Sequence, residues 1–210
     1  MTARVTSWRE PAVLLALTGV ALVISGIGPE DRLTWIMEIL PVLIAAPILI
    51  ITARAFPLTP LCYRLIFIHA LILILGGHYT YAKVPLGLWA QEAFDLARNH
   101  YDRVGHLAQG FIPAIITREV LLRRTPLRRG GWLLTLVTAV CLAISAAFEL
   151  VEWSAAISLG EEADAYLATQ GDVWDTQQDM FMALIGSLTA QLTLGGVHDR
   201  QLASLGGKAT

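Results

Sequence analysis

NHYDRVGHLAQG, residues 99–110, opens an apolar segment that continues to about Leu122 and predicts a helix of membrane-spanning length. Asp102 and His106 stand at positions i and i+4, so a helix places both on one face. In one interpretation, Asn99 caps the helix and Asp102 contributes to this cap, because acids are favoured near helix N-termini. His106 then forms an ordinary hydrogen bond with a neighbouring residue. Alternatively, the pair belongs to a functional site. Similar residues at the same depth of other apolar segments favour this second interpretation.

The composition indicates an integral membrane protein. Of the 210 residues, 55% are hydrophobic and 15% are charged, whereas soluble domains average about 25% charged residues. The net charge of −2 gives no sign of a nucleic-acid partner. The sequence predicts an all-α fold, a single polytopic membrane bundle over residues 1–210 surrounded by membrane lipids and compatible with an oligomer. About six transmembrane helices are expected, at about 11–28, 33–53, 61–82, 102–122, 132–157 and 175–195.

Basic residues fall on alternate connections between these apolar runs. The positive-inside rule places such connections in the cytoplasm, so both termini are predicted to be cytoplasmic. The segment 83–99, on the opposite side, includes a candidate interfacial helix around Trp89. The basic residues of the inner side are Arg4, Arg9, Arg54, Arg64, Arg118, Arg123, Arg124, Arg128, Arg129, Arg200 and Lys208.

With this orientation, ionisable residues of five spans gather in the outer half of the bundle or at its rim. Inserting a charged side chain at the membrane centre costs about 2.5–3.5 kcal/mol, so such residues are functional candidates. Asp175 and Asp179 share one helix face with the small residues Ala183 and Gly186, which predict close packing against a neighbour. The gathered residues are Glu38, His78, Asp102, His106, Glu149, Glu152, Asp172, Asp175 and Asp179.

Several carboxylates cannot all stay ionised together in a low dielectric unless they share protons or a cation neutralises them. Carboxylate oxygens with imidazole suit Mg²⁺, Mn²⁺, Zn²⁺ or Fe²⁺, so a divalent metal is the predicted cofactor. The expected metal ligands, which should line one pocket, are Asp102, His106, Glu149, Glu152, Asp175 and Asp179. The candidate catalytic groups are His78, Tyr79, Asp102, His106 and Asp172.

Two further features lie outside this group. Glu119 falls at the inner end of its span with Arg123 at i+4, and an ion pair between them explains it. Cys62 and Cys141 lie on oppositely directed segments, so a disulfide framework is not expected, and neither has metal-site spacing.

Four blocks of the sequence, HYTYA, RNHYDRVGHLAQGFIPA, FELVEW and GDVWDTQQDM, occur in order within residues 60–195. In these blocks the chain resembles the uncharacterised bacterial inner-membrane proteins of the YjdF type. The resemblance implies a multi-pass protein of the bacterial inner membrane. More loosely, the Asp102–His106 block and the late helix with Asp175 and Asp179 are similar to VanZ-like membrane proteins, which are linked to the cell envelope and to glycopeptide resistance.

Three functions are compatible with the sequence. The first is a metal-dependent enzyme that acts on a lipid or a lipid-linked phosphate or glycan at the outer leaflet. The second is a small proton- or cation-coupled transporter, against which the absence of an inverted sequence repeat counts. The third is a non-catalytic protein of envelope homeostasis whose acidic cluster is a structural network. The apolar inner halves of the later spans favour a pocket that opens outward and is closed below.

Overall fold

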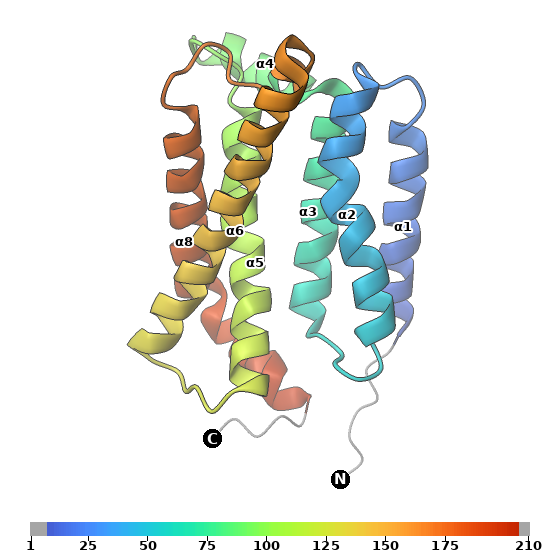
Figure 1. Ribbon diagram of the computed structural model, residues 1–210. Helices are drawn as coiled ribbons and strands as arrows, with labels where there is room; N and C mark the ends of the chain where they lie inside the picture. Colours follow the sequence, from blue (N-terminus) through green and yellow to red (C-terminus); the bar gives the residue numbers. More distant parts are fainter. Residues whose placement is uncertain (1–7, 206–210) are drawn as a thin grey trace.

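The computed structural model describes residues 8–205, except the side chains of Glu161, Glu162 and Asp164. Six long helices stand side by side, and the short elements lie at the end opposite to the chain termini (Figure 1). No strand occurs in the described part of the chain, which confirms the all-α prediction. In order, the elements are α1 (Arg9–Ser25), α2 (Arg32–Thr52), α3 (Pro60–Tyr79), η1 (Tyr81–Lys83), α4 (Pro85–Ala93), α5 (Tyr101–Arg124), α6 (Gly131–Leu159), η2 (Gly160–Ala163), α7 (Asp164–Leu167) and α8 (Asp175–Ser204).

Four helices, α2, α3, α6 and α8, are long and apolar enough to cross a membrane. The other two long helices run beside them (Figure 1), but α1 has 17 residues and α5 carries charged residues at both ends. A membrane fold is confirmed, while a count of six crossings stays a prediction. The helix α8 continues about nine residues beyond the predicted end at 195, because its last turns pack His198 and Leu202 into the interior.

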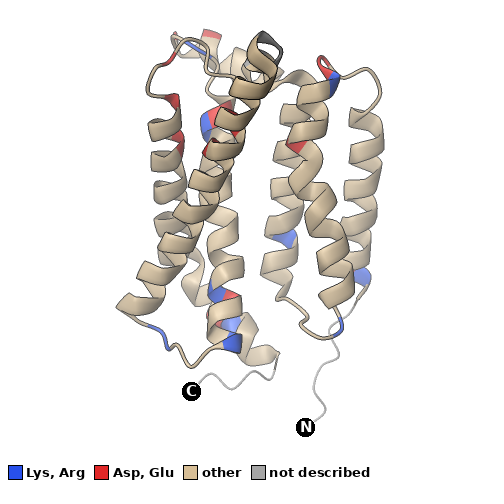
Figure 2. Cartoon of the chain, in the orientation of Figure 1, with Lys and Arg blue, Asp and Glu red and all other residues tan. Residues whose placement is uncertain are grey.

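Charged residues separate between the two ends of the bundle (Figure 2). Most Lys and Arg lie at the end where α1 begins and α8 finishes, and most Asp and Glu lie at the other. This distribution supports the predicted cytoplasmic termini. We call the two ends inner and outer accordingly.

The helices α5 and α8 make the closest approach in the bundle. A Cβ atom added at Gly110 of α5 would collide with the carbonyl oxygen of Ala183, and one added at Gly186 of α8 would collide with that of Leu107. Ala183 and Ala190 of α8 are completely buried. The small-residue face of α8 therefore packs closely against a neighbour, as the sequence predicts, and the structure identifies that neighbour as α5. This packing brings the Asp179 face beside His106.

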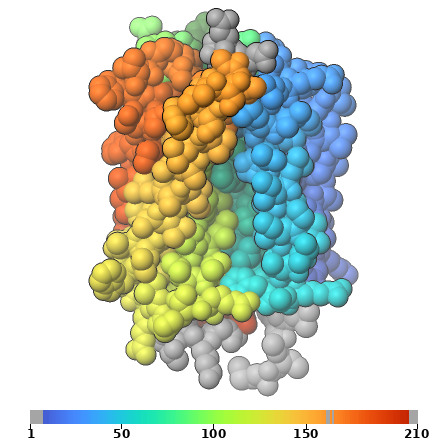
Figure 3. Space-filling view, viewed as in Figure 1, coloured from blue at the N-terminus to red at the C-terminus, as the bar shows by residue number. Residues whose placement is uncertain are grey.

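The remaining long helices pack around this pair. The helix α6 lies against both α5 and α8, whereas α3 joins α5 to the α1 and α2 side. On one face of the molecule a hollow separates α6 from α2, with α3 visible at its floor (Figure 3). The segment of the candidate interfacial helix does form a helix, α4, whose Leu86 and Trp89 are exposed, and its place at the membrane interface stays a prediction.

The start of α5 differs from the predicted cap. The helix begins at Tyr101, and the Asn99 side chain accepts a hydrogen bond from the Tyr101 N–H at 3.0 Å. Its amide donates to the carbonyls of Ala82 and Val84 at 3.0 and 3.2 Å. Asp102 makes no cap bond, because its carboxylate faces charged groups inside the bundle.

Candidate functional site

A cluster of buried charged residues occupies the outer half of the bundle, where α5, α6 and α8 meet the loop before α5. We call it the outer cluster. Its members are Arg98, Asp102, Arg103, His106, Glu149, Asp175 and Asp179, each with a relative exposure of 9% or less.

Arg103 lies at the centre of the outer cluster. Its guanidinium pairs with Asp175 at 2.7 Å, with Asp102 at 3.3 Å and with Asp179. It also reaches Asp172, at 3.2 Å, in the loop before α8. A planar guanidinium with five donors can bridge several carboxylates in this way, which a lysine could not.

Arg98 lies beside Arg103 and repeats part of this pattern. It pairs with Asp175 at 2.8 Å and with Asp172 at 3.4 Å, and it lies 3.9 Å from Asp102. It also donates to the carbonyls of Ala168 and Thr169, at 3.1 and 2.8 Å, which ties the loop before α8 to the site.

Neither arginine was predicted from the sequence as a site residue. Shared protons or a metal were expected to neutralise the acids, whereas the structure supplies two guanidinium groups. A signal was present, because a charged residue next to Asp102 within an apolar segment also needs a buried partner. The partners of Arg103 on α8 are about seventy residues away and leave no local pattern.

The imidazole of His106 sits between three carboxylates. Its Nε2 lies 3.4 Å from Asp102 Oδ1 and 3.8 Å from Asp179 Oδ1, and its Nδ1 lies 3.7 Å from Glu149 Oε1. One ligand atom each of Asp102, His106 and Asp179 lie within 4.8 Å of one another. The structure therefore brings together five of the six predicted metal ligands. Asp102, Glu149 and Asp179 surround His106, and Asp175 lies beside them, paired with the two arginines.

Polar atoms on the inner side of the outer cluster lack partners. Both carboxylate oxygens of Glu38 and of Glu149, His106 Nδ1 and Gln109 Oε1 are buried without a hydrogen bond among the described residues. A cavity of about 20 Å³ lies here, lined in part by Tyr81, His106 and Gln109. It has room for about one water molecule. Unsatisfied buried groups are costly, so these atoms mark the region as a candidate for binding water or another polar species.

The other predicted site residues lie apart from this centre. His78 Nδ1 donates to the Ser25 carbonyl at 2.8 Å, because the last turn of α3 faces the end of α1, and Tyr79 packs edge-on against His78. Glu152 is half-buried on α6. Among the described residues, no hydrogen bond or ion pair joins these three to the outer cluster.

Asp172 lies at the rim, on the solvent side of the arginines. Its Oδ1 accepts a hydrogen bond from the Trp174 N–H at 2.9 Å. This bond, together with the charges of Arg103 and Arg98, lowers the pKa of Asp172. The carboxylate stays ionised at neutral pH, which suits an arginine partner better than a proton donor.

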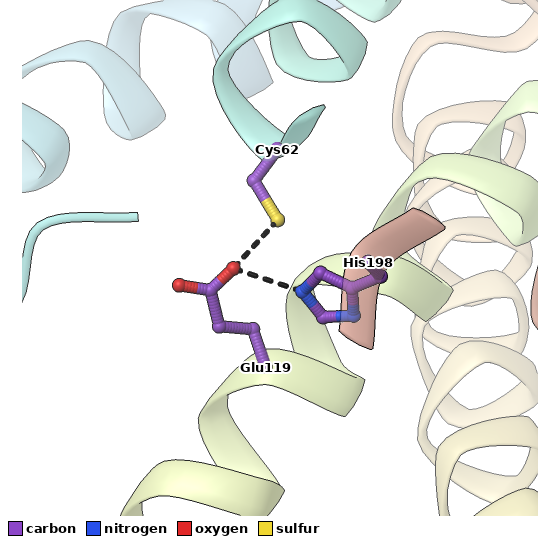
Figure 4. A group of neighbouring side chains, drawn as sticks. All are labelled: Cys62, Glu119 and His198. Carbon is purple, nitrogen blue, oxygen red and sulfur yellow. Dashed lines mark hydrogen bonds and ion pairs between the residues drawn. The ribbon is translucent and has the colours of Figure 1, made fainter. Parts of the chain in front are cut away.

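A second cluster closes the inner end of the bundle between α3, α5 and α8. We call it the inner cluster, and Figure 4 shows its centre. It consists of Thr59, Cys62, Arg118, Glu119, Arg123 and His198, of which Thr59, Cys62, Glu119 and His198 are completely buried.

Glu119 accepts most of the hydrogen bonds at the centre of the inner cluster. Its Oε2 accepts from the Thr59 hydroxyl at 2.7 Å, His198 Nε2 at 3.0 Å and the Cys62 thiol at 3.1 Å (Figure 4). Its Oε1 accepts from the Thr59 N–H at 3.1 Å and from Arg123 at 2.5 Å. The predicted pair with Arg123 is present, but it is one of five contacts that join three helices.

The tautomer of His198 follows from its partners. Arg118 Nη1 lies 2.9 Å from His198 Nδ1, and an arginine can only donate, so Nδ1 accepts. The proton of the neutral imidazole is then on Nε2 and points at Glu119. Cys62, Glu119 and His198 have ligand atoms within metal-sharing distance, yet no imidazole lone pair is free for an ion. The arrangement is that of a hydrogen-bonded clamp.

Comparison with known proteins agrees with the resemblance in the four sequence blocks. The model of a family described as predicted membrane protein, DUF2238, matches residues 10–200. The chain is 52% identical over 185 residues to the inner membrane protein YjdF of Escherichia coli (strain K12), which covers 88% of each protein. No solved structure matches. The looser similarity to VanZ-like proteins gains no support from these matches.

Proposed function

The chain belongs to the predicted membrane protein family DUF2238 and is a multi-pass protein of the inner membrane, and we propose that its outer cluster is the active site of a metal-dependent enzyme. The proposed substrate is a lipid or a lipid-linked phosphate or glycan, reached from the outer face. The observation that carries the proposal is the convergence of Asp102, His106 and Asp179, with Glu149 behind the imidazole.

The separations of the three groups suit one ion. Zinc–nitrogen and zinc–oxygen bonds of about 2.0–2.2 Å place tetrahedral ligand atoms about 3.3–3.6 Å apart. His106 Nε2 lies 3.4 Å from Asp102 Oδ1 and 3.8 Å from Asp179 Oδ1. Small side-chain movements would bring the three atoms onto a common ion. Mg²⁺, Mn²⁺ and Fe²⁺ also accept carboxylate and imidazole ligands, so the choice of metal is left to experiment.

Glu149 supplies the support that a metal-bound histidine needs. Imidazole ligands commonly donate their second ring N–H to a carboxylate, which fixes the tautomer. His106 Nδ1 faces Glu149 Oε1 at 3.7 Å, and neither Glu149 oxygen has another hydrogen bond among the described residues. With Nδ1–H directed at Glu149, the Nε2 lone pair is free to face Asp102 and Asp179.

The charge balance also favours a cation. Four aspartates, Asp102, Asp172, Asp175 and Asp179, surround the two guanidinium groups. With all four aspartates ionised and His106 neutral, two negative charges remain before Glu149 is counted, and a divalent ion would balance them in a medium of low dielectric.

A metal in this position would polarise a phosphoryl or carbonyl oxygen or activate a water molecule. The residues of the chain would hold and orient the reacting groups, with Arg98 and Arg103 keeping the aspartates ionised and in place. A carrier would need a polar route to the inner end. The cavity found in the inner half is lined almost entirely by apolar side chains, which supports the enzyme hypothesis over the transporter.

The test uses purified full-length protein, loaded in separate samples with Zn²⁺, Mg²⁺, Mn²⁺ or Fe²⁺. Each sample is incubated with phosphatidic acid, a polyprenyl phosphate or a lipid-linked glycan, and products are measured by mass spectrometry. We expect metal-dependent turnover that Asp179→Asn abolishes, whereas Asp95→Asn, the same change at an exposed residue outside the outer cluster, retains most of it. Glu149→Gln should weaken metal affinity about 10–100-fold. Turnover that is unchanged in Asp179→Asn would refute the proposal.

A further inference from the structure

An apolar cavity of about 700 Å³ lies between α1, α2, α3 and α5, on the inner side of the polar site. We propose that it binds one hydrocarbon chain of a membrane lipid whose polar head lies at the outer cluster. The assignment of the head to the outer cluster rests on the proposed function, whereas the binding of the chain rests on the cavity itself.

The lining of this cavity fits a hydrocarbon chain. Its volume falls within the range of about 300–1,000 Å³ that is usual for small-molecule sites. Apolar side chains from all four helices make most of its wall, and they include Leu14, Ala46, Phe67 and Ile112. Along α1 it extends from Trp8 to Thr18, which is about 15 Å at 1.5 Å per residue. Such a wall offers little to an ion or to a polar solute.

Prolines and alanines leave the space open. Pro41 of α2 and Pro113 of α5 both line the cavity, and a proline inside a helix removes a backbone hydrogen bond and bends the chain. Ala45 and Ala46 face the same space with side chains too short to fill it. A gap of this size surrounded by lipid would be filled by lipid chains.

The apolar cavity shares wall residues with the polar site, and this contact indicates what kind of molecule fits. His69 and Leu73 of α3 line both the apolar cavity and the small polar cavity that contains His106 and Gln109. His69 Nε2 is buried without a hydrogen-bond partner among the described residues, as are His106 Nδ1 and Gln109 Oε1. A molecule that follows this path needs an apolar part below His69 and a polar part above it. An amphiphile with one chain in the cavity meets both requirements, and a helix of a partner protein meets only the first.

The experiment uses the full chain reconstituted in vesicles of phosphatidylethanolamine and phosphatidylglycerol. The probe is a single-chain lipid phosphate with a diazirine in the middle of its chain, and the labelled residues are identified by mass spectrometry. We expect labelling to concentrate on cavity residues such as Ala46, Phe67 and Ile116. Ala46→Phe should reduce it at least fivefold.

The matched control is Ala16→Phe, the same change at an exposed position of α1 that does not line the cavity. The cavity residues of the Ala16→Phe variant should be labelled to the same extent as those of the unmodified protein. Ala46→Leu, a smaller change, keeps the test interpretable if the phenylalanine variant does not fold. Labelling spread evenly over lipid-facing residues, or equal in Ala46→Phe and Ala16→Phe, would overturn the proposal.

Metal content measured on the same samples separates the two proposals. If labelling concentrates in the cavity while the unmodified protein binds no metal, the hydrocarbon-chain site is supported and the metal-dependent enzyme is refuted. If metal-dependent turnover occurs without cavity labelling, only the hydrocarbon-chain site is refuted.

Discussion

The outer and inner clusters contain similar residues but differ in how completely those residues are paired. Each joins α5 to α8 with a histidine, two arginines and buried carboxylate, which is Glu119 alone in the inner cluster, and each has three ligand atoms within metal-sharing distance. In the inner cluster the oxygens of Glu119 and both nitrogens of His198 have partners. In the outer cluster Glu149 and His106 Nδ1 face each other at 3.7 Å but make no hydrogen bond among the described residues.

This difference separates a structural network from a candidate site. A network in which every buried group is satisfied fixes the helices and leaves nothing for a ligand. A network with unsatisfied groups and excess negative charge is costly unless it binds something. The number of ionisable residues alone would not distinguish the two ends, because both have arginines, acids and an imidazole.

The largest effect on stability is expected from Glu119→Gln in the inner cluster. The change removes the carboxylate on which Arg123 and His198 depend, and breaking a buried pair in this way costs about 3–5 kcal/mol. The free energy of unfolding in detergent measures it. The control is Glu10→Gln, which breaks an exposed pair with Arg64 and should cost about 1 kcal/mol or less. Equal effects of the two variants would contradict the description of the inner cluster as a clamp.

The second-largest effect on stability is expected from Gly110→Ala, because Gly110 lies where α5 meets α8 and these two helices carry both clusters. The new Cβ would meet the backbone of Ala183, so α5 and α8 must separate, at a cost of about 1–3 kcal/mol or more. Metal affinity should fall as well, since Asp179 moves away from His106. Gly19→Ala, where nothing lies near the added Cβ, should change neither quantity. A tolerated Gly110→Ala would show that the contact between α5 and α8 does not hold the site together.

Asp179→Asn should abolish metal binding while it leaves the free energy of unfolding nearly unchanged. It removes one of four aspartates around two arginines, so the lost ion pair is offset by reduced repulsion, and stability should change by about 1 kcal/mol or less. Metal binding, measured by elemental analysis after dialysis, should be lost. Destabilisation as large as that of Glu119→Gln would make the outer cluster a structural network like the inner one.

The smallest effect is expected from Asp172→Asn at the rim, and it should depend on pH. Its lowered folded-state pKa means that the ionised group contributes stability above its unfolded pKa of about 3.9. That contribution is lost as the pH falls through the lower folded-state pKa. The small difference in melting temperature between variant and unmodified protein at pH 7 should therefore disappear towards pH 3. A difference that grows on acidification would contradict the ion pairs with Arg98 and Arg103.

The sequence predicts the fold well because hydropathy and helical spacing are local properties. The apolar runs become the long helices, and the small face of α8 packs closely against a neighbour as its spacing indicates. Asp102 and His106 meet because they lie one turn apart. Glu149 was expected in the same pocket because of its depth, and it faces His106. The pairing of Arg103 with α8 was not expected, since its partners there are about seventy residues away. Glu119 illustrates the same limit, because its i+4 arginine was visible while Thr59, Cys62 and His198 were not.

Anomalous X-ray diffraction from crystals of the full chain grown with Zn²⁺ tests the central claim most directly. Data collected at the zinc edge should give one strong peak between Asp102 Oδ1, His106 Nε2 and Asp179 Oδ1, and the peak should vanish in Asp179→Asn. No peak should appear among Cys62, Glu119 and His198, because the only imidazole lone pair there accepts from Arg118. A peak at the inner cluster, or well-ordered outer side chains with no peak between them, would contradict the account.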